Sequence, residues 1–212
     1  MDKLVQLRQE YRQQPLSKKE VNEDPFLQFK KWFNEAIKAK VNEPTAMVLS
    51  TVTLSGTPSS RVVLLKGLEN ESFQFYTNYE SDKAIEISNN NNVSLLFFWP
   101  ELDRQVRITG KANKSEKRIS DEYFSTRPEG SKISAWASPQ SCEIPSRKFL
   151  EDAYIEFEKK FDGITIERPP HWGGYGVETG SFEFWQSRPE RLHDRILYVK
   201  EGEEWLIKTL AP

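Results

Sequence analysis

The feature that most constrains the fold is a series of short segments, rich in β-branched and aromatic residues, that begins at Ala46 and is interrupted by turn residues. The segments 46–54 and 60–68 flank Ser55-Gly-Thr-Pro58, a combination that predicts two antiparallel strands joined by a turn. The same criteria predict further strands at 72–78, 93–99, 104–113, 176–178, 182–186, 195–200 and 205–210. Alternation of strands with helices is scarce, and neither a glycine-rich nucleotide fingerprint nor a P-loop is present. The sequence therefore favours a predominantly β fold, an antiparallel barrel with peripheral helices, over a parallel doubly wound sheet.

Helix signals surround these strands. Asp24 followed by Pro25 is typical of a helix start, and apolar residues then recur at helical spacing to about Val41. Further helices are predicted at 82–89, 115–125, 131–137 and 146–161. The last of these helices has an apolar stripe that we expect to be buried, formed by Phe149, Leu150, Ala153 and Phe157.

The predicted elements suggest one domain preceded by an arm. Residues 1–23 are polar and highly charged, which predicts a mobile N-terminal arm, and residues 24–212 are expected to form a single domain with added helices. No apolar segment is long enough to span a bilayer, and Met1-Asp-Lys does not begin a secretory signal. We therefore expect a cytoplasmic protein that does not act on membranes.

Charge and cysteine content exclude several classes of function. The formal net charge is −2 and the pI is about 5.9, which disfavours a nucleic-acid binder, so any phosphate must be held by a local group of cations. Cys142 is the only cysteine, so an internal disulfide is impossible. The two histidines, His171 and His193, are distant in sequence, and neither a catalytic cysteine nor a metal site is expected.

The richest group of polar residues lies near the C-terminus. Glu183-Phe-Trp-Gln186 is followed after a short turn by Arg191-Leu-His-Asp-Arg195. If the second segment is a strand, Arg191, His193 and Arg195 project from the same face. Such a face is suited to a flat anionic ligand.

These two segments closely resemble the C-terminal signature of the pyridoxine (pyridoxamine) 5′-phosphate oxidase family. Further blocks resemble the family in the family's order: Arg61-Val-Val-Leu-Leu-Lys66, Phe75-Tyr-Thr-Asn78, Arg104-Gln-Val106, Trp136-Ala-Ser-Pro-Gln-Ser141 and Trp172-Gly-Gly174. The resemblance covers nearly the whole chain and is loose only to about Glu23. It implies the FMN-binding split-barrel fold and a homodimer with FMN at the subunit interface.

The resemblance also implies which residues hold the cofactor. Among them, Arg61 is expected at the phosphate end of FMN. The set is Arg61, Val62, Val63, Leu64, Leu65, Lys66, Tyr76, Thr77, Lys83, Gln105, Gln140, Ser141, Trp185 and Arg195. We expect the side chains of residues 62–65 to be strand core and to contact the flavin through backbone amides. Asp82 departs from the family pattern, which has arginine before the lysine, and because a carboxylate would repel a phosphate we expect Asp82 to face solvent.

A second set is implied for the substrate, which has its own phosphate. It consists of Arg8, Tyr11, Lys66, Tyr123, Arg127, Ser131, Arg191 and His193. Helical phase would place Tyr123 and Arg127 on one face. Arg191 and His193 are similar to the family's residues at the reacting carbon, so they are the candidate catalytic residues and are expected to orient the substrate.

The implied activity is FMN-dependent oxidation of pyridoxamine 5′-phosphate or pyridoxine 5′-phosphate to pyridoxal 5′-phosphate in vitamin B6 biosynthesis and salvage. Dioxygen would accept the electrons and give hydrogen peroxide, and the amine substrate would also release ammonia. Two alternatives stay open: a flavin reductase that uses a nicotinamide cofactor, and a non-catalytic carrier of FMN or pyridoxal phosphate. The substrate set disfavours the reductase, whereas Asp82 keeps the carrier under consideration.

Overall fold

The computed structural model describes residues 15–69 and 71–212. The predicted ligands Arg8 and Tyr11 lie outside this range. Contacts divide the chain into two compact units. Unit 1 contains residues up to Leu49, Ser94–Gly110 and Thr179–Pro212, and unit 2 contains Ser50–Val93 and Lys111–Glu178. The prediction of one domain over residues 24–212 stays a prediction.

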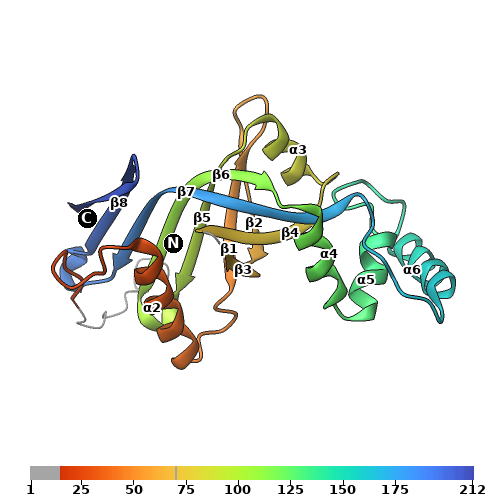
Figure 1. Ribbon diagram of the computed structural model, residues 1–212, viewed down its shortest axis with the longest axis horizontal. Coiled ribbons are helices and arrows are strands. Elements are labelled where there is room, and N and C mark those ends of the chain that lie inside the picture. The colour runs from red at the N-terminus through yellow and green to blue at the C-terminus, as the bar shows by residue number, and fades with distance from the viewer. Residues whose placement is uncertain (1–14, 70) are drawn as a thin grey trace, which may run out of the picture. The chain divides into compact units, whose positions relative to one another are not determined.

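The strands hydrogen-bond in the order β2-β1-β5-β6-β7-β4-β3, and β8 pairs with both β7 and β9 (Figure 1). Their bounds are β1 Ala46–Val52, β2 Pro58–Leu64, β3 Gly67–Glu69, β4 Ser72–Asn78, β5 Asn92–Trp99, β6 Arg104–Lys114, β7 Trp172–Gln186, β8 Asp194–Glu201 and β9 Glu204–Leu210. The pairs β3–β4 and β4–β7 within unit 2, and β7–β8 and β8–β9 within unit 1, are antiparallel. The predicted antiparallel β fold is confirmed.

In unit 1, the helix α2 (Pro25–Lys38) covers the sheet strands. Asp24 caps it as the sequence predicts, because its carboxylate accepts hydrogen bonds from the backbone amides of Phe26 at 2.7 Å and Leu27 at 3.4 Å. The buried face of α2 packs aromatic rings against β5 and β7, with centroid distances of 5.0 Å for Phe26 and Phe182, 5.0 Å for Phe29 and Phe97, and 5.2 Å for Trp32 and Phe184. These rings are nearly fully buried and form the core of unit 1.

Residues 15–23, the described part of the predicted arm, belong to unit 1 and contact its strand β8. The backbone amide of Leu16 donates to the Asp194 carboxylate at 2.9 Å, and the Tyr198 hydroxyl donates to the carbonyl of Asn22 at 2.7 Å. The side chain of Leu16 is buried. These contacts place the end of the arm beside the start of β8.

Unit 2 adds helices to its strands. They are α3 (Asp82–Asn89), α4 (Lys117–Ser125), α5 (Glu129–Ala137) and α6 (Arg147–Phe161), and the last three follow one another on one side of the unit (Figure 1). Their core joins Phe124, Ile133, Phe161 and Trp172, the first residue of β7. The expected burial of the α6 stripe is confirmed only in part, because Phe157 is partly buried against this core while Phe149 is 44% exposed.

Two predictions about the C-terminal region are wrong. Segments 176–178 and 182–186 are parts of one continuous strand, β7. Residues 189–191 form a 3-10 turn in which Glu190 and Arg191 have φ angles of 58° and 62°, and β8 begins only at Asp194. Arg191 and His193 therefore do not share a strand face with Arg195.

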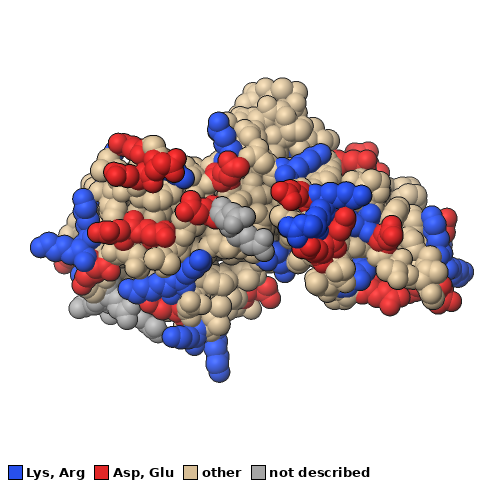
Figure 2. Space-filling model, in the orientation of Figure 1, with Lys and Arg blue, Asp and Glu red and all other residues tan. Residues whose placement is uncertain are grey.

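None of the helices in the described ranges is long and apolar enough to cross a membrane. Lys and Arg side chains are interspersed with Asp and Glu on the visible surface (Figure 2), in agreement with the small net charge.

Gly173 in β7 offers a test of close packing in unit 2. A Cβ atom at this position would lie 2.2 Å from the Tyr79 hydroxyl and 2.7 Å from its ring carbon Cζ, whereas a Cβ on Gly180 of the same strand would meet nothing closer than 3.8 Å. We expect Gly173→Ala to lower the free energy of unfolding by about 1–3 kcal/mol. Gly180→Ala is the matched control, and equal urea midpoints for the two variants would contradict the packing described.

Candidate active site

A pocket of about 540 Å³ in unit 2 gathers most of the predicted ligand-binding residues of that unit. The residues from the predicted sets that line it are Val62, Val63, Leu64, Lys66, Tyr76, Thr77, Lys83, Tyr123, Arg127, Ser131 and Gln140. They come from β2, β4, the helices α3 to α5 and the loops beside them. Its volume is in the range of small-molecule sites.

The pocket is strongly cationic. Lys66, Lys83 and Arg127 line it, and none of the described lining residues is Asp or Glu. Asp82 is exposed at the start of α3, as predicted, and does not line the pocket. A cationic cavity of this kind favours an anionic ligand.

At one end of the pocket, three donors converge on the Gln140 side-chain oxygen. They are the Thr77 hydroxyl at 3.0 Å, the Lys83 ammonium at 3.1 Å and the backbone amide of Asn78 at 3.4 Å. Burial lowers the pKa of Lys83, Arg61 lowers it further, and Asp82 and Glu86 oppose this change. A donor cluster with a partly desolvated cation is chemically suited to a phosphate group.

Arg127 and an aromatic wall form another part of the pocket. The ring centroids of Tyr76 and Tyr123 are 3.8 Å apart, and those of Tyr76 and Trp172 are 5.5 Å apart, with interplanar angles of 15° and 12°. The guanidinium carbon of Arg127 lies 4.4 Å from the centre of the Trp172 ring. Burial lowers the pKa of Arg127, and its Nη1 atom is buried without a hydrogen-bond partner among the described residues. A buried, unsatisfied guanidinium donor is the expected feature of an anion site.

The positions of Tyr123 and Arg127 agree with the prediction, but the reason differs. Helix α4 ends at Ser125, so Arg127 lies beyond the helix rather than on its face. Its stacking on Trp172, and not helical phase, brings it to the pocket. Burial raises the pKa of the Tyr123 hydroxyl, whereas Arg127 lowers it, so Tyr123 stays a neutral donor.

Three predicted cofactor residues of unit 2 are not among the lining residues. Leu65 is buried, Ser141 is exposed in a turn with a φ of 72°, and Arg61 is partly buried. The Arg61 guanidinium donates to Glu86 at 3.0 Å and to the Ser59 hydroxyl at 2.6 Å, and also contacts Thr51.

The side chains of β2 correct another expectation. Leu65 is buried as expected but lies beyond the last residue of β2, and the side chains of Val62 and Leu64 are 64% and 37% exposed. They lie on the pocket wall rather than in the interior.

The remaining predicted residues belong to unit 1. Trp185 and His193 have ring centroids 4.6 Å apart, and Trp185 lies opposite Arg195 in the β7–β8 register. The Arg195 guanidinium donates to Glu183 at 2.8 Å and to the carbonyl of Ala211 at 2.8 Å. Gln105 lies half-buried on β6, and Arg191 is exposed.

His193 is held by the turn that precedes it. Its Nδ1 atom accepts a hydrogen bond from the backbone amide of Arg188 at 3.1 Å, so the proton of the neutral ring lies on Nε2. Burial lowers the pKa of His193, Arg191 lowers it further, and Asp194 opposes this. The neutral form is therefore favoured near pH 7.

The prediction from sequence missed three lining residues, Thr126, Pro128 and Trp172. Trp172 belongs to the family block Trp172-Gly-Gly174, which could have indicated a place in the site. A tryptophan is equally typical of core packing, however, so the block did not assign it to the pocket. Thr126 and Pro128 flank Arg127 and have no chemical signal of their own. His171 does not line the pocket, and its Nε2 atom lies 3.0 Å from the carbonyl oxygen of Ala135.

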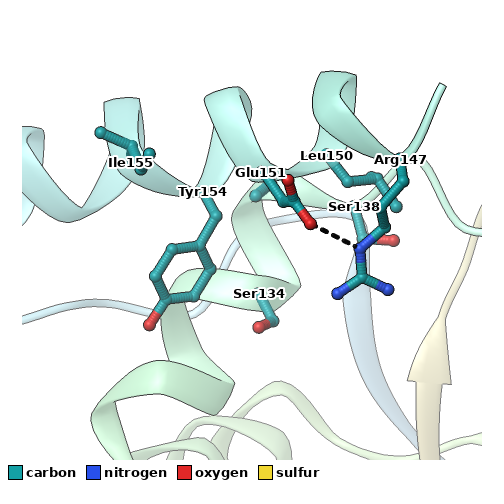
Figure 3. Close-up of a pocket in the computed structure, with 8 residues that line it drawn as sticks. Ser134, Ser138, Arg147, Leu150, Glu151, Tyr154 and Ile155 are labelled. Atoms are coloured by element: carbon teal, nitrogen blue, oxygen red, sulfur yellow. Dashed lines mark hydrogen bonds and ion pairs between the residues drawn. The ribbon is translucent and has the colours of Figure 1, made fainter. Parts of the chain in front are cut away.

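A larger groove, of about 620 Å³, lies between α5 and α6 but lacks the chemistry of a site (Figure 3). Its two charged lining residues, Arg147 and Glu151, form an exposed ion pair of 3.1 Å at successive turns of α6. The hydroxyl of Ser134 donates to the carbonyl of Gly130 at 2.8 Å. The smaller, cationic pocket is therefore the better candidate.

The antiparallel sheet with peripheral helices and the cationic pocket with its aromatic wall define a split-barrel protein with a site suited to anionic aromatic ligands. A family model described as pyridoxamine 5′-phosphate oxidase matches residues 33–161, and a model described as the pyridoxine 5′-phosphate oxidase C-terminal dimerisation region matches residues 172–212. The chain belongs to the pyridoxamine 5′-phosphate oxidase family.

Individual relatives agree over the whole length. The chain is 49% identical over 213 residues to the pyridoxine/pyridoxamine 5′-phosphate oxidase of Cupriavidus necator, with 100% of each chain covered. It is also 49% identical over 209 residues to that of Rubrobacter xylanophilus, with 99% of this chain and 96% of the relative covered.

Solved structures confirm the split-barrel fold. PhzG from Burkholderia lata, in complex with tetrahydrophenazine-1-carboxylic acid, has a TM-score of 0.87 and 30% identity over 93% of this chain and 98% of its own. A pyridoxamine 5′-phosphate oxidase-related, FMN-binding protein from Nostoc punctiforme has a TM-score of 0.69 at 17% identity, with 87% of this chain and 97% of its own covered. The second likeness shows the fold alone.

Arg127 provides a test of the pocket as an anion site. We expect Arg127→Met to weaken binding of pyridoxal 5′-phosphate at least about tenfold, because a charge-assisted hydrogen bond contributes about 1.5–3 kcal/mol. Binding of unphosphorylated pyridoxal, measured by quenching of tryptophan fluorescence, should not change. An equal loss for both ligands would show that Arg127 supports the pocket wall and does not bind the phosphate.

Proposed function

We propose that this protein uses FMN to oxidise pyridoxamine 5′-phosphate or pyridoxine 5′-phosphate to pyridoxal 5′-phosphate, with dioxygen as the electron acceptor. The products besides the aldehyde are hydrogen peroxide and, from the amine, ammonia. The observation that carries the proposal is the pocket of unit 2, which combines Lys66, Lys83 and Arg127 with a wall of stacked aromatic rings. The 49% identical relatives bear the name of this activity.

The residues of the pocket fit FMN. Lys83, Thr77 and the backbone amide of Asn78 already act as donors to a single oxygen of Gln140, and the same donors would hold the cofactor's phosphate. Arg61 lies close enough to lower the pKa of Lys83 and would add positive potential near the phosphate. FMN, when bound, supplies the hydride acceptor and the route of electrons to dioxygen.

The second group of donors would hold the substrate. Arg127 has a buried donor without a partner, and Tyr123 and Ser131 add neutral hydroxyl groups beside it. Lys66 would lie between the two ligands. The main contribution of these residues is to hold the reacting carbon in a fixed position, which replaces an encounter in solution by a preorganised complex.

Arg191 and His193 are proposed as the residues that orient the substrate ring. The neutral imidazole of His193 has its proton on Nε2, so it can donate a hydrogen bond without adding charge. Gln105, Trp185 and Arg195 are proposed as further cofactor ligands. Arg8 and Tyr11 stay predicted substrate ligands.

The match to a C-terminal dimerisation region over residues 172–212 supports a homodimer as the working assembly. We also propose that the protein acts in the cytoplasm.

The most direct test follows pyridoxal 5′-phosphate and hydrogen peroxide together after FMN-loaded protein meets pyridoxamine 5′-phosphate in air. Both products should form in equal amounts. Bleaching of the flavin by a nicotinamide donor without action on the amine would favour a flavin reductase, and a stable yellow protein without product would favour a carrier. Arg191→Ala should reduce turnover much more than FMN retention, whereas equal losses would assign Arg191 to the cofactor.

The lowered pKa of Lys83 gives a second test. A lysine with a lowered pKa loses its charge at a lower pH than an ordinary lysine, whose pKa is about 10.4. FMN affinity should therefore fall as the pH rises from about 7 towards about 10, because the cation that pairs with the phosphate is lost. Lys83→Arg should flatten this dependence in a flavin fluorescence titration, because a guanidinium stays charged over the range. The same pH profile for both proteins would remove Lys83 from the phosphate site.

A further inference from the structure

Arg168 lies outside the pocket but contacts two of the elements that form its wall. It precedes β7 in the segment Arg168-Pro-Pro170, and its side chain is only 10% exposed. Its Nε atom donates to the carboxylate of Asp121 at 2.6 Å, and its Nη1 atom donates to the backbone carbonyl of Trp172. One planar guanidinium therefore connects α4 to the first residue of β7.

The two contacts of Arg168 lead directly to residues that line the pocket. Asp121 is two positions before Tyr123 on α4, and Trp172 itself lines the pocket. The rings of Tyr123 and Trp172 are nearly parallel, with an interplanar angle of 6° and a centroid distance of 6.3 Å. Because Arg127 stacks on Trp172, a shift of α4 relative to β7 would change the spacing of Tyr123, Trp172 and Arg127 together.

The simplest alternative is that this ion pair only adds stability. Exposed ion pairs contribute little, and Asp121 is 45% exposed. Arg168, however, is mostly buried and uses two different nitrogens of one planar guanidinium for its two partners, a fixed spacing that the single nitrogen of an ammonium reproduces only in part. A further link between α4 and β7 also exists, since the backbone amide of Gly174 donates to the buried Ser120 hydroxyl at 3.1 Å. Loss of Arg168 would therefore leave α4 attached but less well fixed.

We propose that Arg168 is a positioning residue for the substrate, which sets the spacing of Tyr123, Arg127 and Trp172 by fixing α4 against the start of β7. The inference rests on the proposed function. Its effect is selective because the donors proposed for the FMN phosphate, Thr77 and Lys83, are on β4 and α3, which Arg168 does not contact through any hydrogen bond or ion pair among the described residues.

The test is steady-state kinetics with pyridoxamine 5′-phosphate on FMN-loaded wild type, Arg168→Gln and Arg168→Lys. We expect Arg168→Gln to raise KM about tenfold, since small displacements of binding groups have effects of this order, and to change kcat much less. Arg168→Lys should recover part of the loss. The Kd for FMN should match that of the wild type in both variants.

The adjacent residues of α4 provide a matched control. Asp121→Ala removes the partner of Arg168, whereas Glu122→Ala removes a carboxylate that pairs with Arg118 at 2.6 Å on the exposed side of the same helix. Asp121→Ala should raise KM as Arg168→Gln does, and Glu122→Ala should behave as the wild type.

The possible outcomes are distinct. The positioning role of Arg168 would be overturned if Arg168→Gln left KM unchanged. It would also be overturned if this variant lost FMN affinity, thermal stability and kcat together. In either case, normal turnover by the wild type would still support the proposed function. If the wild type neither turns over pyridoxamine 5′-phosphate nor binds pyridoxal 5′-phosphate, the proposed function fails and this inference fails with it. If the wild type binds without turnover, the Kd for pyridoxal 5′-phosphate replaces KM, and equal values in wild type and Arg168→Gln contradict the inference.

Discussion

Partly buried positive charge, with no carboxylate among the described residues that line the pocket, is the constraint on which the site depends. Removing Lys83 and Arg127 from water has a free-energy cost, and the lowered pKa values of both groups reflect that cost. The described lining residues include no Asp or Glu that could offset it, and the nearby Glu86 is paired with Arg61. A dianionic ligand would offset this cost, so under the proposed function the pocket is already arranged to receive a phosphate.

The aromatic wall makes this arrangement possible. Trp172, Tyr76 and Tyr123 form a stacked group, and the face of Trp172 supports the Arg127 guanidinium from one side. The wall in turn requires the close approach of β7 to its neighbours, because a side chain larger than hydrogen at Gly174 would lie 2.8 Å from both Ser115 and Tyr76. The position of the Arg127 guanidinium thus depends on the stacked rings, and the stacked rings depend on the close packing of β7.

The fold could be predicted from the sequence wherever local signals agreed. Asp24 and Pro25 marked the start of α2, and the predicted turn separates the first two strands, although the predicted second strand at 60–68 is divided between β2 and β3. Prediction failed where the backbone departs from regular geometry. The alternation expected from Arg191 to Arg195 assumed an extended chain, but the positive φ angles of Glu190 and Arg191 belong to a turn. β7 was divided in two because residues 179–181 carry no strand signal, although they lie within the strand and Ser181 pairs with Val199.

The site was predicted in composition but not in geometry. Family resemblance identified Lys66, Lys83 and Arg127, and the structure brings them to one pocket. It did not indicate Trp172 as part of the wall, nor the link from Arg168 to Asp121, since partners 47 residues apart leave no periodic signal.

The measurement that tests the account most directly is a crystal structure of the protein with FMN and pyridoxal 5′-phosphate bound together. We expect one phosphate beside Lys83 and Thr77 and the other beside Arg127 and Tyr123, with the two rings between them. Phosphates bound away from these cations, in the groove between α5 and α6 or on the outer surface, would contradict the central claim that this pocket is the active site.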